Sequence, residues 1–449
     1  MTRTTSSTPA YLATDVTAVL PADPLPHDAM PGCALPGTPL ADALPGINAC
    51  VHCGFCLQAC PTYLNLEDEN DSPRGRIFLM RSLLEGTVTP NDSSVQRHID
   101  QCLGCRACEP VCPSGVPYGQ LLEATRATLR AYEPVPFIAR LILFVFAREW
   151  LLRPAMFFSR ILAATPIPTV LSGIKGRLGF AMAMLASTGR SIERSPYQPV
   201  TRGERGNVAT LRGCVMDGLF SETNRATKRV LAVNGYAIAA APGQGCCGAL
   251  HAHAGDLGTA RSLARRNIAA FERSGAEFVA VNAAGCGAIM KEYGHLLKDD
   301  SAWHERAERM SARVKDISEL LAVAGPREGG NLPLRVTYDA PCHLQHAQRV
   351  TQAALSVLAA IPGLSLVPLH DSDQCCGSAG IYNLIEPDTS DAVLAPKLAN
   401  IRATGAPWVA TGNPGCLMQI GAGLIRAEIP ARAIHPVDLL DASYAAFGQ

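Results

Sequence analysis

Apolar and polar positions follow one regular succession over the second half of the chain. Short apolar runs are separated by longer stretches in which apolar residues recur every three to four positions. Strands that alternate with helices in this way are typical of βα units built around a parallel sheet. The runs that we predict as strands are 208–211, 236–241, 278–281, 335–338, 364–369 and 408–410.

The first half has a helical pattern. Ser72 and Pro73 precede apolar residues at helical spacing, and Gly86 follows them, which predicts a helix that ends near this glycine. A second helix is predicted after Pro117. The expected fold class is therefore α+β and multidomain, with a helical unit ahead of two α/β units.

Changes in pattern give the expected domain boundaries. A stretch rich in proline, alanine and threonine shows no periodicity and is predicted to be a disordered leader. The five expected parts are the leader 1–45, a helical cysteine-rich domain 46–133, a helical linker region 134–205, and two α/β modules at 206–330 and 331–449.

Composition narrows the class of protein. The 449 residues are 48% hydrophobic, which excludes wholesale disorder. Lysine and arginine number 39, as do aspartate and glutamate, and this balance argues against a nucleic-acid partner. No apolar core of a secretory signal is visible, so we expect a cytoplasmic protein with reduced thiols. Clustered cysteines then indicate metal ligands.

The segment 136–158 has the most apolar run, 141–147, but arginines flank it and it is too short to span a membrane. Three interpretations of this segment stay open: an amphipathic helix on the inner face of the membrane, a partner-docking helix, or a helix packed on its own domain.

Sixteen of the 17 cysteines fall into two repeated patterns. The first is the bacterial ferredoxin run, three cysteines at two-residue gaps followed by Cys-Pro, which appears twice. In two-cluster ferredoxins the fourth cysteine binds the other cluster, so the expected sets are Cys50, Cys53, Cys56 with Cys112 and Cys102, Cys105, Cys108 with Cys60. We interpret these runs as two [4Fe–4S] sites that carry electrons. Zinc sites usually pair two Cys-x-x-Cys knuckles, and the double run does not fit that alternative.

The second pattern places one early cysteine, a Cys–Cys–Gly and one late cysteine in each α/β module. The eight residues are Cys214, Cys246, Cys247, Cys286, Cys342, Cys375, Cys376 and Cys416. Zinc, a further iron–sulfur cluster, a redox dithiol and buried inert thiols all remain open for them. His251, His253 and His343 lie beside these cysteines as candidate ligands or sulfur hydrogen-bond donors.

These motifs together resemble the iron–sulfur subunit of bacterial glycolate oxidase. The resemblance covers about residues 46–445 and rests on SPRGRIFLM (72–80), QCLGCRACEPVCPSGVPYGQLLE (101–123), GCCGALHAH (245–253), AAGCGAIMKEYGHLL (283–297), PCHLQHAQ (341–348) and CCGSAGIYNL (375–384). The ferredoxin pair alone is shared with many oxidoreductases. Its combination with the SPRGR and GCGAIMKEYG stretches is far more specific.

The resemblance implies a complex with FAD-binding subunits that oxidise glycolate, and often D-lactate. Electrons would pass through two [4Fe–4S] clusters to a membrane quinone or another acceptor, with no substrate site on this chain. The Cys–Cys–Gly modules also look like those of heterodisulfide reductase, which bind a non-cubane cluster. Here Gly287-Ala288-Ile289 follow Cys286, and Leu417-Met418-Gln419 follow Cys416. Each module thus lacks one thiolate of that pattern.

Three rival functions remain. The chain is the iron–sulfur subunit of a lactate-utilisation or anaerobic glycerol-3-phosphate dehydrogenase system, a thiol–disulfide reductase that uses Cys246–Cys247 or Cys375–Cys376, or a scaffold with structural clusters. The one G-x-G-x-x-G match, 243–248, overlaps the first Cys–Cys–Gly, and no P-loop motif occurs. The sequence shows no clear flavin or nicotinamide site.

Overall fold

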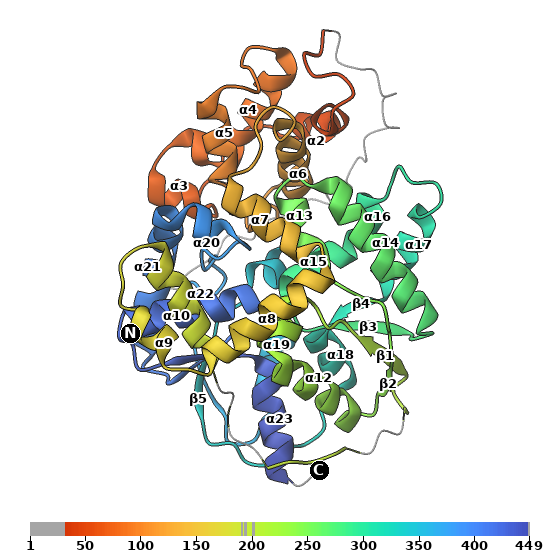
Figure 1. The fold of residues 1–449 in the computed structure, drawn as a ribbon, viewed down its shortest axis with the longest axis vertical. Helices are drawn as coiled ribbons and strands as arrows, with labels where there is room; N and C mark the ends of the chain where they lie inside the picture. The colour runs from red at the N-terminus through yellow and green to blue at the C-terminus, as the bar shows by residue number, and fades with distance from the viewer. Residues whose placement is uncertain (1–31, 190–191, 193–194, 200–202, 448–449) are drawn as a thin grey trace, which may run out of the picture.

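The computed structural model describes residues 32–189, 192, 195–199 and 203–447. Figure 1 shows the helical cysteine-rich domain at the top and the two α/β modules below it. Helix α7 lies just below the cysteine-rich domain, and α8 crosses the middle of the view in front of the modules. The predicted fold class is confirmed. Within the described residues, no helix has the length and apolar character needed to cross a membrane.

The cysteine-rich domain is built from short helices. They are α1 (Pro39–Asp42), α2 (Leu44–Asn48), α3 (Pro61–Leu66), the 3-10 helix η1 (Glu69–Asp71), α4 (Pro73–Glu85), α5 (Ser93–Asp100) and α6 (Tyr118–Leu129). The expected start and end of α4 are observed, because Ser72 accepts a hydrogen bond from the Gly75 amide and Gly86 closes the helix in a left-handed conformation.

The predicted leader is wrong for residues 32–45, and residues 1–31 lie outside the described part. Leu35 and Leu40 are buried in the core of the cysteine-rich domain, and the Leu40 amide donates to Thr128 Oγ1 on α6. Thr38 caps α1 by accepting from the Ala41 amide. The sequence pattern failed because these helices are too short to show a period and depend on tertiary packing.

The first module contains a four-stranded parallel sheet of order β2-β1-β3-β4. Its strands are β1 (Asn207–Thr210), β2 (Ala237–Ala239), β3 (Phe278–Val281) and β4 (Val314–Asp316). Its helices are α11 (Val215–Leu219), α12 (Ser221–Val233), α13 (Ala249–His253), α14 (Leu257–Arg273), α15 (Ala284–Lys291), α16 (Tyr293–Leu296), α17 (His304–Arg313) and α18 (Ile317–Ala324).

The second module repeats this topology as β6-β5-β7-β8, again parallel. Its strands are β5 (Arg335–Tyr338), β6 (Ser365–Val367), β7 (Trp408–Ala410) and β8 (Arg432–Ile434). Its helices are the π-helix η2 (His343–Ala347), α19 (Ala353–Ala359), α20 (Tyr382–Ile385), α21 (Pro387–Thr404), α22 (Pro414–Arg426) and α23 (Pro436–Phe447). The six predicted strands are all present, whereas the edge strands β4 and β8 were not expected.

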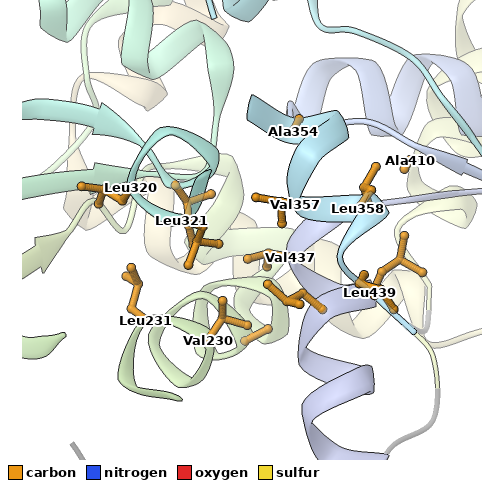
Figure 2. Packing of buried hydrophobic residues seen from close by; sticks show 14 of the residues in the cluster. Val230, Leu231, Leu320, Leu321, Ala354, Val357, Leu358, Ala410, Val437 and Leu439 are labelled. Carbon is orange, nitrogen blue, oxygen red and sulfur yellow. The ribbon is translucent and has the colours of Figure 1, made fainter. Parts of the chain in front are cut away.

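The two modules share one hydrophobic core. Figure 2 shows Val230 and Leu231 of α12 and Leu320 and Leu321 of α18 facing side chains of the second module. Those partners are Val357 and Leu358 of α19 and Val437 and Leu439 of α23. Because this core is continuous across the repeat, the modules form a paired unit.

Four helices join the two halves of the chain, namely α7 (Phe137–Phe146), α8 (Glu149–Ala163), α9 (Ile167–Leu171) and α10 (Arg177–Ser187). Leu143 and Leu152 are buried, and α10 packs on α22 of the second module. The segment 136–158 therefore packs on the rest of the protein through a few of its apolar residues. Many of its large apolar side chains stay exposed.

Arg76 is the largest fully buried side chain of the cysteine-rich domain. Its guanidinium donates to the His98 carbonyl (2.6 Å), to Thr62 Oγ1 (3.0 Å) and to Asp71 Oδ1 (3.1 Å). One arginine thus joins α3, η1, α4 and α5. The SPRGR stretch is visible in the sequence, but no local pattern indicates that its second arginine is internal.

We expect Arg76→Met to destabilise the cysteine-rich domain by about 3–5 kcal/mol, because it leaves the Asp71 carboxylate buried without its cation. The matched variant Arg74→Met removes a partly exposed ion pair with Glu69 and should cost less than about 1 kcal/mol. Urea unfolding followed by circular dichroism measures both. Equal losses in the two variants would contradict the structural role of Arg76.

Candidate iron–sulfur sites and thiol sites

The structure gathers the first ferredoxin-type group at one place. Cys50, Cys53, Cys56 and Cys112 line one small cavity, with Cys108 also at its wall. The loop turns sharply here, and Gly54 has a positive φ of 85° with Arg74 packed against it. Burial raises the pKa of Cys56 to about 11. The thiol therefore keeps its proton at neutral pH, and a metal ion that binds this sulfur has to displace that proton.

The second group lies deeper. Cys60, Cys102, Cys105 and Cys108 are all buried, and burial raises the pKa of Cys108, with the neighbouring Cys105, Cys102 and Cys60 acting in the same direction. Burial raises the pKa of Cys60, and the positive charge of Arg76 acts in the opposite direction. The same arginine therefore stabilises the fold and the thiolate form of this site.

Hydrogen-bond donors surround the sulfur atoms of the second group. The Gly104 amide donates to Cys102 Sγ (3.4 Å), and the Tyr118 hydroxyl lies 3.6 Å from the same atom. Thr62 Oγ1 lies 3.2 Å from Cys60 Sγ. Amide and hydroxyl donors to sulfur are the environment in which iron–sulfur clusters are held. The residues present therefore fit the cluster type that the sequence indicates.

In each α/β module the cysteines follow the carboxyl ends of the strands, as expected for ligands of open parallel sheets. In the first module, Cys214 contacts Cys246, and Cys246 contacts Cys247. Cys247 Sγ lies 3.1 Å from Cys286 Sγ. Each thiol thus contacts the next, and we call this succession of four the thiol row.

The second module has the same row. Cys342 contacts Cys375, and Cys375 contacts Cys376. Cys376 Sγ lies 3.4 Å from Cys416 Sγ. All four are buried. The repeated geometry shows that both copies keep a thiol site.

The two copies differ in their relation to the ferredoxin-type sites. Cys105 of the second group contacts Cys375 directly, and hydrogen bonding from Cys375 lowers the pKa of Cys105. Leu103, Ala107 and Val393 pack around this contact. Only long-range folding brings these cysteines together, because 270 residues separate them in the chain. No sequence signal had indicated it.

One side chain joins the two thiol rows. Asn413 Nδ2 donates to Cys416 Sγ at 3.5 Å, while its Oδ1 accepts from the Gly285 amide at 3.2 Å. Gly285 immediately precedes Cys286. A chain of contacts therefore runs from Cys105 through both modules to Cys214, and sequence analysis had not singled out Asn413.

The three histidines take different roles. His343 Nδ1 lies 3.5 Å from Cys342 Sγ, so this histidine can hydrogen-bond sulfur. His253 pairs with Glu123 of α6 at 3.0 Å, and its ring lies against that of His343. His251 Nε2 lies 3.0 Å from the Leu143 carbonyl. His253 and His251 therefore tie the first module to α6 and α7.

Three parts of the chain match known protein families. Residues 46–116 match the family described as "4Fe-4S dicluster domain", and residues 208–291 and 336–421 match "Cysteine-rich domain". A solved structure of a hypothetical protein from Helicobacter pylori aligns over 71% of this chain and 74% of that chain. Its TM-score is 0.39 at 10% sequence identity, which is too low to carry an argument.

Curated relatives extend along most of the chain. It is 38% identical to the probable glycolate oxidase iron-sulfur subunit of Bacillus subtilis, over 87% of this chain and 92% of that protein. It is 37% identical to the glycolate oxidase iron-sulfur subunit of Escherichia coli, over 82% and 88%. Lactate utilization protein A of Exiguobacterium sp. is 29% identical over 52% of this chain and 97% of that protein. The chain therefore belongs to the family of glycolate oxidase iron–sulfur subunits.

Proposed function

We propose that this chain carries electrons from FAD in partner subunits, which oxidise glycolate or a related 2-hydroxy acid such as D-lactate, to a quinone-type acceptor. The observation that carries the proposal is the pair of four-cysteine groups, one at a surface cavity and one buried, in a chain whose relatives over most of its length are glycolate oxidase subunits. Bound [4Fe–4S] clusters supply one-electron carriers. No substrate site is assigned to this chain.

We propose the crossed ligand sets for the two clusters. Cys50, Cys53, Cys56 and Cys112 would hold one cluster, and their shared cavity supports this grouping. Cys102, Cys105, Cys108 and Cys60 would hold the other, supported by the mutual proximity of these thiols around Cys108. The division into domains at 46–133, 134–205, 206–330 and 331–449 is likewise proposed.

Double variants test the pairing. Cys53→Ser with Cys112→Ser disrupts one proposed set and should leave about 4 iron atoms per chain, whereas Cys53→Ser with Cys60→Ser disrupts both and should leave nearly none. Iron analysis after anaerobic purification measures this. Cys33→Ser, outside both runs, is the control and should keep about 8 iron atoms. The reverse result for the two doubles would show that each run binds its own cluster.

A second experiment tests the function itself. Anaerobic affinity purification from the native host should recover flavoproteins and glycolate-dependent dye reduction, and Cys105→Ser should lower that rate by at least about tenfold because it breaks the electron path. Cys33→Ser should leave the rate unchanged. An eluate that contains iron but neither flavoprotein nor glycolate activity would contradict the assignment. Disulfide reduction without a flavoprotein would favour the thiol–disulfide reductase instead.

We also propose that the chain is cytoplasmic and attaches to the inner face of the membrane. Among the described residues, exposed large apolar side chains gather between 137 and 178, and we name this set the apolar surface. It consists of Phe137, Ile138, Leu141, Phe144, Trp150, Phe157, Phe158, Ile161, Ile167, Val170, Ile174 and Leu178.

The charged residues of this segment indicate which partner the apolar surface binds. Between residues 136 and 178 the chain has six basic side chains and one acidic side chain, Glu149. Aromatic and aliphatic side chains with basic residues among them suit an anionic lipid surface. Twelve exposed large apolar residues within 137–178 are also more than the single apolar residues scattered over ordinary surfaces.

Flotation with vesicles tests the attachment. The chain should bind vesicles that contain phosphatidylglycerol and bind neutral phosphatidylcholine vesicles several-fold more weakly, because basic residues contribute about 1 kcal/mol each near an anionic surface. Trp150→Ser with Phe158→Ser should release it, whereas Phe78→Ser, an exposed phenylalanine on α4, should not. If the double variant keeps vesicle binding but loses the flavoproteins, the apolar surface is a subunit interface.

A further inference from the structure

A large cavity lies between α8 and the first module, outside the ferredoxin-type sites. Its volume is about 720 Å³, within the range of small-molecule sites. The loops after β1 and β2 supply one side, including Cys214 and Cys246. The cavity therefore ends at the thiol row of the first module.

The lining combines apolar and basic groups. Leu152, Met156 and Phe157 of α8 form part of an apolar wall, while Arg212 and Arg266 lie among the lining residues near the thiols. Arginine side chains also outnumber acids in the lining. Such a site suits a ring system whose oxygens gain negative charge on reduction, because guanidinium groups stabilise that charge and the wall covers the ring.

The acid nearest these arginines is already engaged. Glu149 lines the cavity and forms ion pairs with Arg266 and Arg153. Hydrogen bonding from Arg266 lowers the pKa of Glu149, so it is a carboxylate at neutral pH. Arg212 forms a longer ion pair with the same carboxylate at 3.7 Å, a distance that leaves its donors without a hydrogen bond to Glu149. Its donors therefore remain available to a ligand.

The cavity is continuous with the apolar surface. Phe157 and Phe158 line the cavity and are also 52% and 67% exposed members of that surface. A ligand dissolved in a bilayer under α7–α9 would reach the cavity without crossing water. This continuity favours a lipid-soluble ligand over a free carboxylate.

A continuous succession of contacts leads from the buried ferredoxin-type group toward the same cavity. Cys105 contacts Cys375, and the second thiol row continues through Cys376 to Cys416. Asn413 then bridges to the segment Gly285–Cys286.

The first thiol row completes this route. It runs from Cys286 through Cys247 and Cys246 to Cys214, and Cys246 and Cys214 line the cavity. The whole path consists of covalent links and direct contacts between side chains or backbone.

We propose that this cavity binds the head of a quinone with an apolar tail, and that electrons leave the chain there. The inference rests on the proposed function, because the oxidised 2-hydroxy acid supplies the electrons through the partner flavin. One quinone takes up two electrons, delivered singly, and two protons from water at the cavity mouth, and leaves as the quinol. Arg212 is a positioning and binding residue for the quinone oxygen.

The test uses the full chain and a short-chain ubiquinone as probe. Arg212→Leu should raise the dissociation constant of the quinone, measured by calorimetry, at least tenfold through loss of a charged hydrogen bond, whereas Arg225→Leu should not change it. Arg225 is an exposed arginine of the same module that pairs with Glu222 outside the cavity. A second pair of variants tests whether the quinone occupies the volume of the cavity. Ala147→Phe fills the cavity and should block binding, whereas Ala155→Phe, on the exposed side of α8, should not.

Turnover by the whole complex completes the test. Arg212→Leu should raise the KM for the quinone while glycolate still reduces the clusters at the wild-type rate. Equal quinone affinity in Arg212→Leu and Arg225→Leu would overturn the proposal, as would displacement of the quinone by glycolate. A wild-type complex whose clusters glycolate does not reduce refutes the proposed function instead, and calorimetry on the isolated chain still decides the cavity.

Discussion

The junction around the contact between Cys105 and Cys375 fixes the cysteine-rich domain against the two α/β modules. It places a ligand of the buried ferredoxin-type group against the thiol row of the second module, and further interactions hold that contact. Arg106 pairs with Glu109 in its own domain and with Glu292 of the first module, and Tyr382 donates to the Gln101 carbonyl. The thiol contact alone would not hold the two domains together, because a single contact of this kind contributes little free energy of stabilisation. The surrounding ion pairs and hydrogen bonds supply the rest.

The duplication explains why two similar thiol rows have different surroundings. Both modules keep the same sheet and the same row of four thiols, but only the second row touches the ferredoxin-type domain among the described contacts. The first row ends instead at the cavity under α8. The shared core between the modules fixes their relative position. A symmetric repeat thereby acquires an inner copy and an outer copy, and α8 packs on α11 of the outer copy while α10 packs on α22 of the inner one.

Much of this fold could be predicted from sequence because its signals are local. Ser72 and Gly86 mark the ends of α4, and the apolar runs mark six strands. The edge strands β4 and β8 were missed because each has three residues and includes charged side chains, so only pairing with β3 or β7 defines them. The burial of Arg76, the bridging role of Asn413 and the Cys105–Cys375 contact depend on residues distant in sequence. A single sequence does not carry that information.

The central claim is that substrate electrons pass through the two four-cysteine groups of this chain. Freeze-quenched electron paramagnetic resonance after mixing the native complex with glycolate tests it most directly. The account predicts that reduced [4Fe–4S] signals from both clusters appear within a single turnover time, and that they disappear when a quinone is added. Clusters that stay oxidised during glycolate turnover, although dithionite reduces them, would contradict the account and leave these sites with a structural role.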